Sequence, residues 1–252
     1  MAAEGTRPRR SKFSDFVALH VPGDPVVLYN IWDAGSAKVV VEAGGKAIAT
    51  GSHPVADALG LSDGEQVPIE LVLENARRIV AAVDVPVTID FEGAYSADPG
   101  TGGANVALLK QTGAVGCNFE DQVVGGEGLH PLKDQVERIT AIRRAVGDDF
   151  FINARTDLRI KDQAAPLAEV IDRGKAFADA GASGFFVPRL GDPREVEKVV
   201  REVPLPLNLI AFPGAPSKAL WASAGCARIS HGPFPLRELM VRFKEMATAA
   251  IS

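Results

Sequence analysis

The amino-acid sequence predicts a (β/α)8 barrel, an α/β fold of the TIM-barrel type, and three observations lead to this prediction. Short runs of β-branched and aromatic residues alternate with longer amphipathic stretches, and eight such pairs can be counted. The short runs are continuously apolar, which is typical of parallel strands covered by helices on both faces. With 252 residues, of which 46% are hydrophobic, the chain can bury one large core.

The predicted elements follow one another regularly along the chain. Strands are predicted at residues 26–32, 46–50, 85–90, 114–120, 150–155, 183–188, 205–210 and 227–231. Helices are predicted after them at residues 34–44, 69–83, 101–112, 133–147, 165–180, 193–202, 216–224 and 235–250. Asp192 followed by Pro193 is typical of a helix start. An extra N-terminal helix is predicted at 13–20 and would cover the bottom of the barrel.

Composition and charge limit the location and the partners of the protein. The net charge is −5 and the basic residues are spread along the chain, so we expect no nucleic-acid or membrane partner. The basic N-terminal segment lacks a following apolar stretch, which predicts a flexible tail at 1–12 before a single domain at 13–252. Cys117 and Cys226 lie in apolar segments without CxxC spacing, as expected of buried thiols in a cytoplasmic protein.

Carboxylates gather at the predicted C-terminal strand ends, where barrels of this class carry their active sites. Asp90 and Glu92 are two positions apart and therefore point to one side, and Glu120 ends the adjacent strand. Such a group would be repulsive in a dry pocket unless a cation lay within it. Oxygen ligands suit Mg2+ best, with Mn2+ as the alternative. The competing interpretation is that these acids cap strand ends or pair with Arg155.

Four segments occur in an order that is specific in combination: "TGSHPVADALGLSDGE" (50–65), "TIDFEGAY" (88–95), "VGCNFEDQ" (115–122) and "INARTD" (152–157). Together they resemble the isocitrate lyase and phosphoenolpyruvate mutase superfamily, over about residues 26–231. The resemblance implies action on 2-oxo or 2-hydroxy acids through an enolate. It also implies a homo-oligomer, a tetramer or dimer, in which the last helix is swapped between neighbours.

The resemblance also implies roles for individual residues. The metal-associated acids of the superfamily match Asp90, Glu92 and Glu120, and a gating or metal-water acid matches Asp63. The residues matched to substrate binding are Thr50, Gly51, Ser52, Asn208 and, as an arginine that could hold a carboxylate in bidentate fashion, Arg155. For protonation of the product carbon the candidates are Tyr95, His130, Glu127 and a metal-bound water, and the sequence does not choose among them.

Two departures from the superfamily pattern bear on the reaction. The loop "VVGGEGLH" at 123–130 lacks the K-[KR]-C-G-H sequence of Cys-dependent lyases, and Arg189 replaces their glutamate after the sixth strand. The same loop lacks the basic side chains that would hold a phosphonate, although Arg189 could supply one. The expected activity is Mg2+-dependent carbon-carbon cleavage of a small 2-hydroxy or 2-oxo di- or tricarboxylate. A phosphonopyruvate or phosphoenolpyruvate mutase or hydrolase is the alternative, and a non-catalytic barrel is a minor one.

Overall fold

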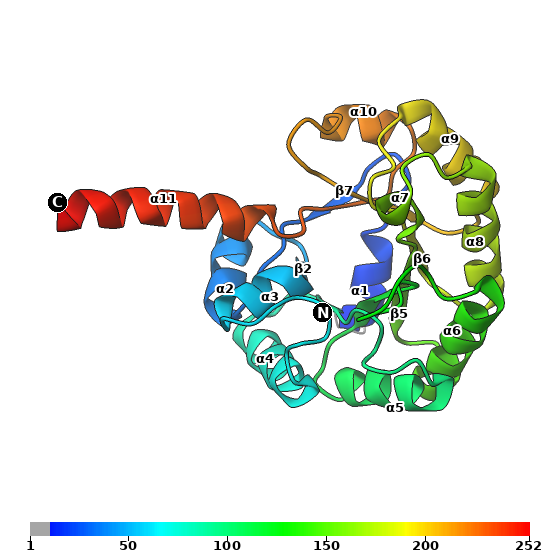
Figure 1. Cartoon of the computed structure of the whole chain (residues 1–252), viewed down its shortest axis with the longest axis horizontal. Helices are drawn as coiled ribbons and strands as arrows, with labels where there is room; N and C mark the ends of the chain where they lie inside the picture. Colours follow the sequence, from blue (N-terminus) through cyan, green and yellow to red (C-terminus); the bar gives the residue numbers. More distant parts are fainter. Residues whose placement is uncertain (1–10) are drawn as a thin grey trace, which may run out of the picture.

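The computed structural model describes residues 11–252 and confirms the predicted fold class. Eight parallel strands form a nearly closed barrel surrounded by helices (Figure 1). The strands are β1 (Val26–Leu28), β2 (Ile48–Ala49), β3 (Val87–Asp90), β4 (Gly116–Glu120), β5 (Phe151–Arg155), β6 (Gly184–Phe186), β7 (Leu207–Ile210) and β8 (Arg228–Ser230). They pair in the order β1-β8-β7-β6-β5-β4-β3-β2. A single bridge between Ile31 and Thr50, just beyond β1 and β2, joins the two remaining edges.

All eight predicted helices are present between or after the strands. They are α2 (Ala34–Glu42), α4 (Ile69–Ala82), α5 (Pro99–Lys110), α6 (Leu132–Val146), α8 (Leu167–Asp179), α9 (Pro193–Glu202), α10 (Lys218–Ser223) and α11 (Phe234–Ile251). At the start of α9, the Asp192 side chain accepts a hydrogen bond from the Arg194 amide, as its cap-then-proline pattern predicts.

Two short helices are not among the predicted elements. They are α3 (Ser52–Ala58), directly after β2, and α7 (Leu158–Lys161), directly after β5. A helix of four to seven residues completes at most two turns, so its apolar positions show no periodicity that the sequence could reveal. Both helices begin at the C-terminal end of the barrel and therefore help to shape the site described below.

An N-terminal helix, α1 (Lys12–Ala18), closes the N-terminal end of the barrel as predicted. Its Phe16 is fully buried against Leu28, Val115 and Phe151, and the rings of Phe16 and Phe151 pack edge to face with centroids 5.2 Å apart. Ser11 caps this helix, so the helical part starts before the predicted boundary at residue 13. The predicted tail otherwise lies at residues 1–10, outside the described residues.

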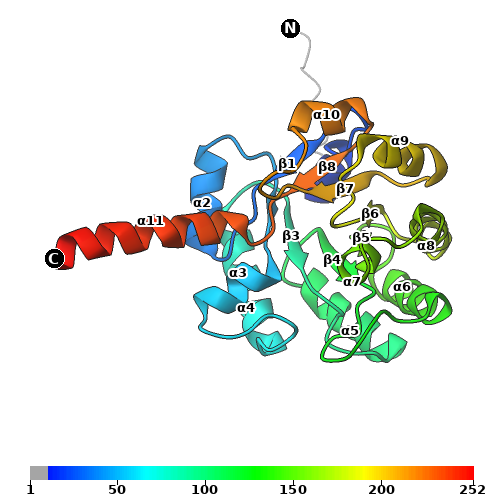
Figure 2. The same cartoon turned by 45° about the horizontal axis from the view of Figure 1, so that its top comes forward.

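The last helix, α11, leaves the barrel and projects away from it (Figures 1 and 2). Only Pro235 and Leu236 of this helix are buried. Its exposed apolar side chains are Leu239, Met240, Val241, Phe243, Met246 and Ile251. Within residues 11–252, the helices include none with the length and apolar character of a membrane span.

Candidate active site

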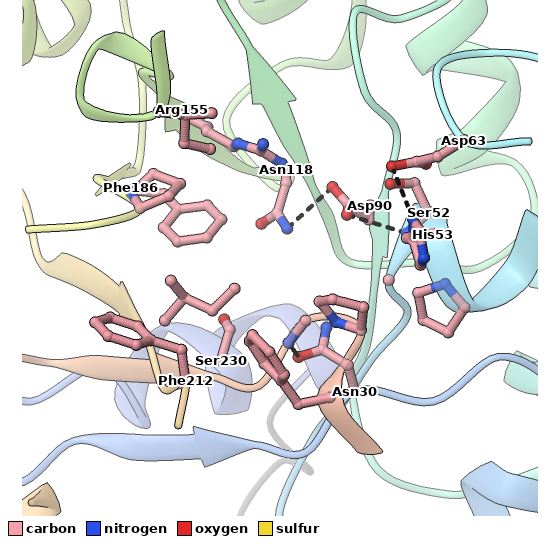
Figure 3. Close-up of a pocket in the computed structure, with 18 of the residues that line it drawn as sticks. Asn30, Ser52, His53, Asp63, Asp90, Asn118, Arg155, Phe186, Phe212 and Ser230 are labelled. Carbon is pink, nitrogen blue, oxygen red and sulfur yellow. Dashed lines mark hydrogen bonds and ion pairs between the residues drawn. The ribbon is translucent and has the colours of Figure 1, made fainter. Parts of the chain in front are cut away.

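A cavity of about 240 Å³ opens at the C-terminal ends of the barrel strands. Residues from all eight strand ends or the loops after them line it, and Figure 3 shows Asp90, Asn118 and Arg155 across its upper part with Asn30, Ser230 and Phe212 below. Of the residues predicted from sequence, those that line this cavity are Gly51, Ser52, Asp63, Asp90, Arg155 and Arg189. Its size suits a small metabolite rather than a polymer.

Asp90 is held in place at the end of β3 by three hydrogen bonds. The Ser52 amide donates to Oδ2 over 3.1 Å, the Asn118 Nδ2 donates to Oδ1 over 3.2 Å, and the Asp90 amide donates to Thr50 Oγ1 over 2.9 Å. Gly51 is required next to this contact because a Cβ there would lie 2.9 Å from Pro54 Cγ. The segment at 50–52 therefore approaches Asp90 closely and fixes the direction of its carboxylate (Figure 3).

Glu92 and Tyr95 lie in a strained turn directly after β3. Glu92, Ala94 and Tyr95 all have positive φ, a conformation that costs free energy for residues other than glycine. The turn is fastened to the loop before α4, since the Glu65 amide donates to Glu92 Oε2 and the Tyr95 amide donates to Glu65 Oε1, both over 2.8 Å. Glu92 and Tyr95 share a small second cavity with Asp90. Burial, and then the charges of Asp63 and Asp90, raise the pKa of Glu92 to about 8.

Arg155 forms ion pairs with two buried acids. Its Nη1 lies 3.0 Å from Glu120 Oε2, while Nε and Nη2 lie 2.6 and 3.0 Å from the two oxygens of Asp157. Burial raises the pKa of Glu120 well above its ordinary value, although Arg155 opposes this. The bidentate edge that we expected to hold a substrate carboxylate is thus occupied by Asp157, the residue from which α7 starts directly after β5.

The three predicted metal carboxylates do not converge into a preformed site. Residues 11–252 contain no group of three or more His, Cys, Asp or Glu side chains arranged to hold a metal ion. Glu120 turns to Arg155, and Glu92 turns to the Glu65 amide. The donor chemistry nevertheless fits Mg2+, which needs only one or two carboxylates and keeps several waters. After burial, the charges of Asp63 and Asp90 contribute to the raised pKa of Glu92, and a cation would relieve this repulsion.

Three other predicted residues lie outside the lining of the main cavity. Glu127 is exposed at the tip of the loop at 123–130, and the backbone amide of His130 donates to the Asp121 carbonyl over 2.8 Å. Asn208 is buried, accepts a hydrogen bond from Asn153 Nδ2 over 2.9 Å, and donates to Ser230 Oγ over 3.1 Å. It therefore contacts the lining residue Ser230 without lining the cavity itself.

The structure adds cavity residues that the sequence analysis did not select. Asn30 accepts hydrogen bonds from the amides of His231 and Gly232, over 2.7 and 2.8 Å, and donates to the Thr50 carbonyl over 2.8 Å, so it joins the ends of β1, β2 and β8. The signal for Asn30 was an amide side chain inside an otherwise apolar run. Arg237, on the first turn of α11, also lines the cavity. No feature of the sequence predicted this, because the pattern of the last helix does not indicate how the helix lies relative to the barrel mouth.

Comparison with known proteins gives a consistent set of matches. The phosphoenolpyruvate phosphomutase family model matches residues 16–251. An uncharacterized protein of Mycobacterium tuberculosis is 34% identical over 224 residues, which cover 87% of this chain and 82% of that protein. A probable 2-methylisocitrate lyase of Corynebacterium glutamicum is 30% identical over 187 residues, 70% of this chain and 60% of that protein. The crystal structure of a presumed phosphonomutase from Burkholderia cenocepacia has a TM-score of 0.91 and 39% identity, and covers 95% of this chain and 98% of that chain.

Proposed function

The chain belongs to the phosphoenolpyruvate mutase family within the isocitrate lyase superfamily, and from this premise we propose that it is a Mg2+-dependent carbon-carbon lyase. Its substrate is a small 2-hydroxy or 2-oxo dicarboxylate or tricarboxylate, which is cleaved through an enolate. A 2-hydroxy acid would give a small oxo acid, whereas a 2-oxo acid would be cleaved with water to two carboxylic acids. Relatives named for carbon-carbon cleavage and for phosphonate chemistry both occur, so the choice between them depends on the cavity.

The observation that carries the proposal is the division of the cavity into a polar and an apolar part. Asp90, Asp63 and Arg155 supply charges near the strand ends, whereas Phe186, Ile210, Phe212 and Ile160 line the cavity with apolar surface. The loop at 123–130 supplies no lining residue and contains no Lys or Arg. A departing carbon group suits this apolar surface, and the loop at 123–130 offers no cationic donor to a phosphonate dianion.

The residues that would hold Mg2+ are Asp90 and the acids around it, Asp63, Glu92 and Glu120. A bound ion would supply Lewis-acid stabilisation of the negative charge that develops on the substrate oxygen during cleavage. The Ser52 amide and Asn118 orient Asp90 for this task. Arg155 balances the charge of Glu120 and Asp157 next to the substrate, and the apolar lining excludes water.

Tyr95 is the proposed proton donor to the product carbon. It shares the small second cavity with Asp90, whereas His130 and Glu127 line neither of the two cavities described here. Burial, and then the charges of Glu92 and Glu65, raise the pKa of Tyr95, so its phenol keeps its proton at neutral pH. A protonated phenol can act as a general acid.

The deciding experiment is a substrate panel with Mg2+: oxaloacetate, 2-methylisocitrate, 2,3-dimethylmalate and phosphonopyruvate. We expect formation of an oxo acid from 2-methylisocitrate or 2,3-dimethylmalate, or of oxalate from oxaloacetate, and loss of this turnover in Asp90→Ala. Turnover of phosphonopyruvate alone would overturn carbon-carbon cleavage. Absence of turnover across the panel, with the same compounds binding, would support the non-catalytic alternative.

Phosphonopyruvate chemistry remains the second candidate for a specific reason. Arg189 and Arg237 both line the cavity, and guanidinium groups are good donors to a phosphonate. The structure thus offers cationic side chains that the loop at 123–130 lacks. The panel separates the two reactions because only phosphonopyruvate releases or transfers a phosphorus group.

A further inference from the structure

We propose that Arg228 is a buried counter-charge of Asp90, which favours binding of an anionic substrate and opposes binding of Mg2+. The inference rests on the proposed function, because it concerns the same site, and it assigns an electrostatic role to a residue outside the cavity lining. Arg228 begins β8 and is fully buried. Ser230, two positions later, lines the cavity, so Arg228 points into the barrel interior one layer below the cavity.

The charge of Arg228 has no direct acidic partner. Within residues 11–252 its guanidinium forms no ion pair, and its Nε and Nη1 have no hydrogen-bond partner. Arg155 and Arg173, in contrast, each pair with a buried acid. On the other side, the Cζ of Arg228 lies 6.0 Å from the centroid of the Phe16 ring of α1. An enclosed arginine without an acid costs free energy, which an apolar side chain of similar length would avoid, so its presence beneath the site indicates a function.

One amide side chain separates Arg228 from Asp90. The Nη2 of Arg228 donates to Asn118 Oδ1 over 3.1 Å. The Nδ2 of Asn118 donates in turn to Asp90 Oδ1 over 3.2 Å (Figure 3). Asn153 Nδ2 also donates to Asn118 Oδ1, over 2.8 Å, so the Asn118 amide keeps its orientation without Arg228. The contribution that only Arg228 makes to this chain of hydrogen bonds is its positive charge.

The charge of Arg228 is present at neutral pH and acts on Asp90. Burial lowers the pKa of Arg228 to about 9, and the negative charge of Asp90 opposes this decrease. Asp90 forms no ion pair within residues 11–252. The charge of Arg155 also acts on Asp90, but Arg155 is already engaged by two acids. The positive charge that is free to balance Asp90 therefore lies below it, on the far side of Asn118.

The sign of the effect on each ligand follows from this charge. A positive charge in a low-dielectric interior attracts an anion and repels a cation at the same place. Arg228 therefore strengthens the binding of a carboxylate substrate and weakens the binding of Mg2+ at Asp90. A general structural disturbance of the site would weaken the binding of both ligands, so opposite changes distinguish an electrostatic role from a structural one.

The test measures both affinities in one set of variants. Calorimetric titration gives the affinity for Mg2+ alone, and then for L-malate, a small 2-hydroxy dicarboxylate, at saturating Mg2+. The proteins are wild type, the neutral variants Arg228→Met and Arg228→Gln, the charged variant Arg228→Lys, and Arg143→Met. Arg143, on α6, is the matched control, because it also bonds to neutral acceptors, the carbonyls of Gly181 and Phe150, over 2.9 Å each, and does not line the cavity. Thermal unfolding verifies that each variant is folded.

We expect the two neutral variants to bind Mg2+ about threefold to tenfold more tightly than wild type, and malate about threefold to tenfold more weakly. Arg228→Lys keeps the charge and should follow wild type, as should Arg143→Met. Weaker binding of both ligands, unchanged affinities in the neutral variants, a lysine variant that behaves as they do, or a wild type that lacks either affinity would each overturn the inference. Failure of both neutral variants to fold would assign Arg228 a structural role and overturn it as well.

This experiment is independent of the proposed reaction, because binding needs no turnover. Opposite shifts of the two affinities in a protein that converts none of the panel compounds would refute only the proposed function. Unshifted affinities in an active lyase would refute only the role of Arg228.

Discussion

The guanidinium of Arg155 and the carboxylate of Asp157 form a two-bond ion pair, with 2.6 Å between Nε and Oδ1 and 3.0 Å between Nη2 and Oδ2. Nη1 of the same guanidinium lies 3.0 Å from Glu120 Oε2. Asp157 is fully buried and Glu120 is 4% exposed, so both acids depend on Arg155 for their partner. Arg155 therefore stabilises the site by balancing both buried carboxylates in the absence of substrate.

This arrangement predicts a large loss of stability in Arg155→Met. The substitution leaves two buried carboxylates without their cation, and breaking a buried ion pair from one side costs about 3–5 kcal/mol. Arg155→Lys should lie between wild type and Arg155→Met, since lysine keeps the charge but not the two-bond geometry. The measurement is the free energy of unfolding in chemical denaturation. Arg237→Met is the matched control and should change it by no more than about 0.5 kcal/mol. Equal stabilities of the two methionine variants would contradict the prediction.

The second prediction concerns the metal. Asp90→Ala should abolish binding of Mg2+ or Mn2+ that is micromolar to millimolar in wild type, because Asp90, unlike Glu92 and Glu120, lines the main cavity. Asp90→Asn keeps the shape of the side chain and should also bind poorly, which attributes the loss to charge. Calorimetric titration measures both. Asp24→Asn, at an exposed position before β1, is the control. Unchanged titration curves in both Asp90 variants would remove Asp90 from the metal site.

The sequence was sufficient to predict the barrel, because strands buried on both faces are continuously apolar and the sequence contains eight such runs. The residues at which each strand begins and ends were less predictable. The strand predicted at 46–50 pairs with β3 only at Ile48–Ala49, since pairing depends on the neighbouring strand as well as on local residues. Helix α3 was not predicted because its seven residues include Pro54. A proline is tolerated in the first turn of a helix, but in the sequence it indicates a helix break.

The site was predictable where a residue ends a strand, and less so where a loop or a helix start brings it in. Asp90 and Arg155 follow from the end-of-strand rule. Asn118 could have been found by counting two residues back from Glu120, because alternate strand residues share a side. Arg237 could not, since its place depends on the direction in which α11 leaves the barrel. The orientation of the acids around Asp90 was not predictable, because spacing does not reveal that Glu120 pairs with Arg155.

The third prediction is a pH dependence of stability that originates at Glu92. Its pKa is about 8 in the folded protein against an ordinary value of 4.5, so between these pH values the folded state holds a proton that the unfolded chain has lost. The stability contributed by Glu92 is therefore fully present below about pH 4.5 and is lost as the pH rises through about 8. Glu92→Gln cannot lose a proton and should escape this loss.

The measurement is the free energy of unfolding of wild type and Glu92→Gln from pH 5 to pH 9 without divalent cations. Relative to wild type, the variant should gain at least about 1.4 kcal/mol over this range, the equivalent of one pKa unit. Glu120 is unchanged in both proteins, so its own titration largely cancels in the comparison. Glu127→Gln, at an exposed loop position, should follow wild type. Parallel curves for wild type and Glu92→Gln would show that Glu92 is ionised in the folded protein.

The fourth prediction concerns assembly through α11. Phe243 is 62% exposed and Met246 is 71% exposed on a helix that projects from the barrel (Figure 2). Exposed apolar side chains grouped on one element favour contact with another surface, and a second copy of the chain is the proposed partner. Phe243→Glu should therefore shift the protein from the mass of a dimer or tetramer to that of one chain, as measured by light scattering after gel filtration. Lys244→Glu adds the same side chain at the next position without removing apolar surface, and should retain the oligomer. A wild type with the mass of one chain, or a Phe243→Glu variant with unchanged mass, would exclude α11 as the contact between copies.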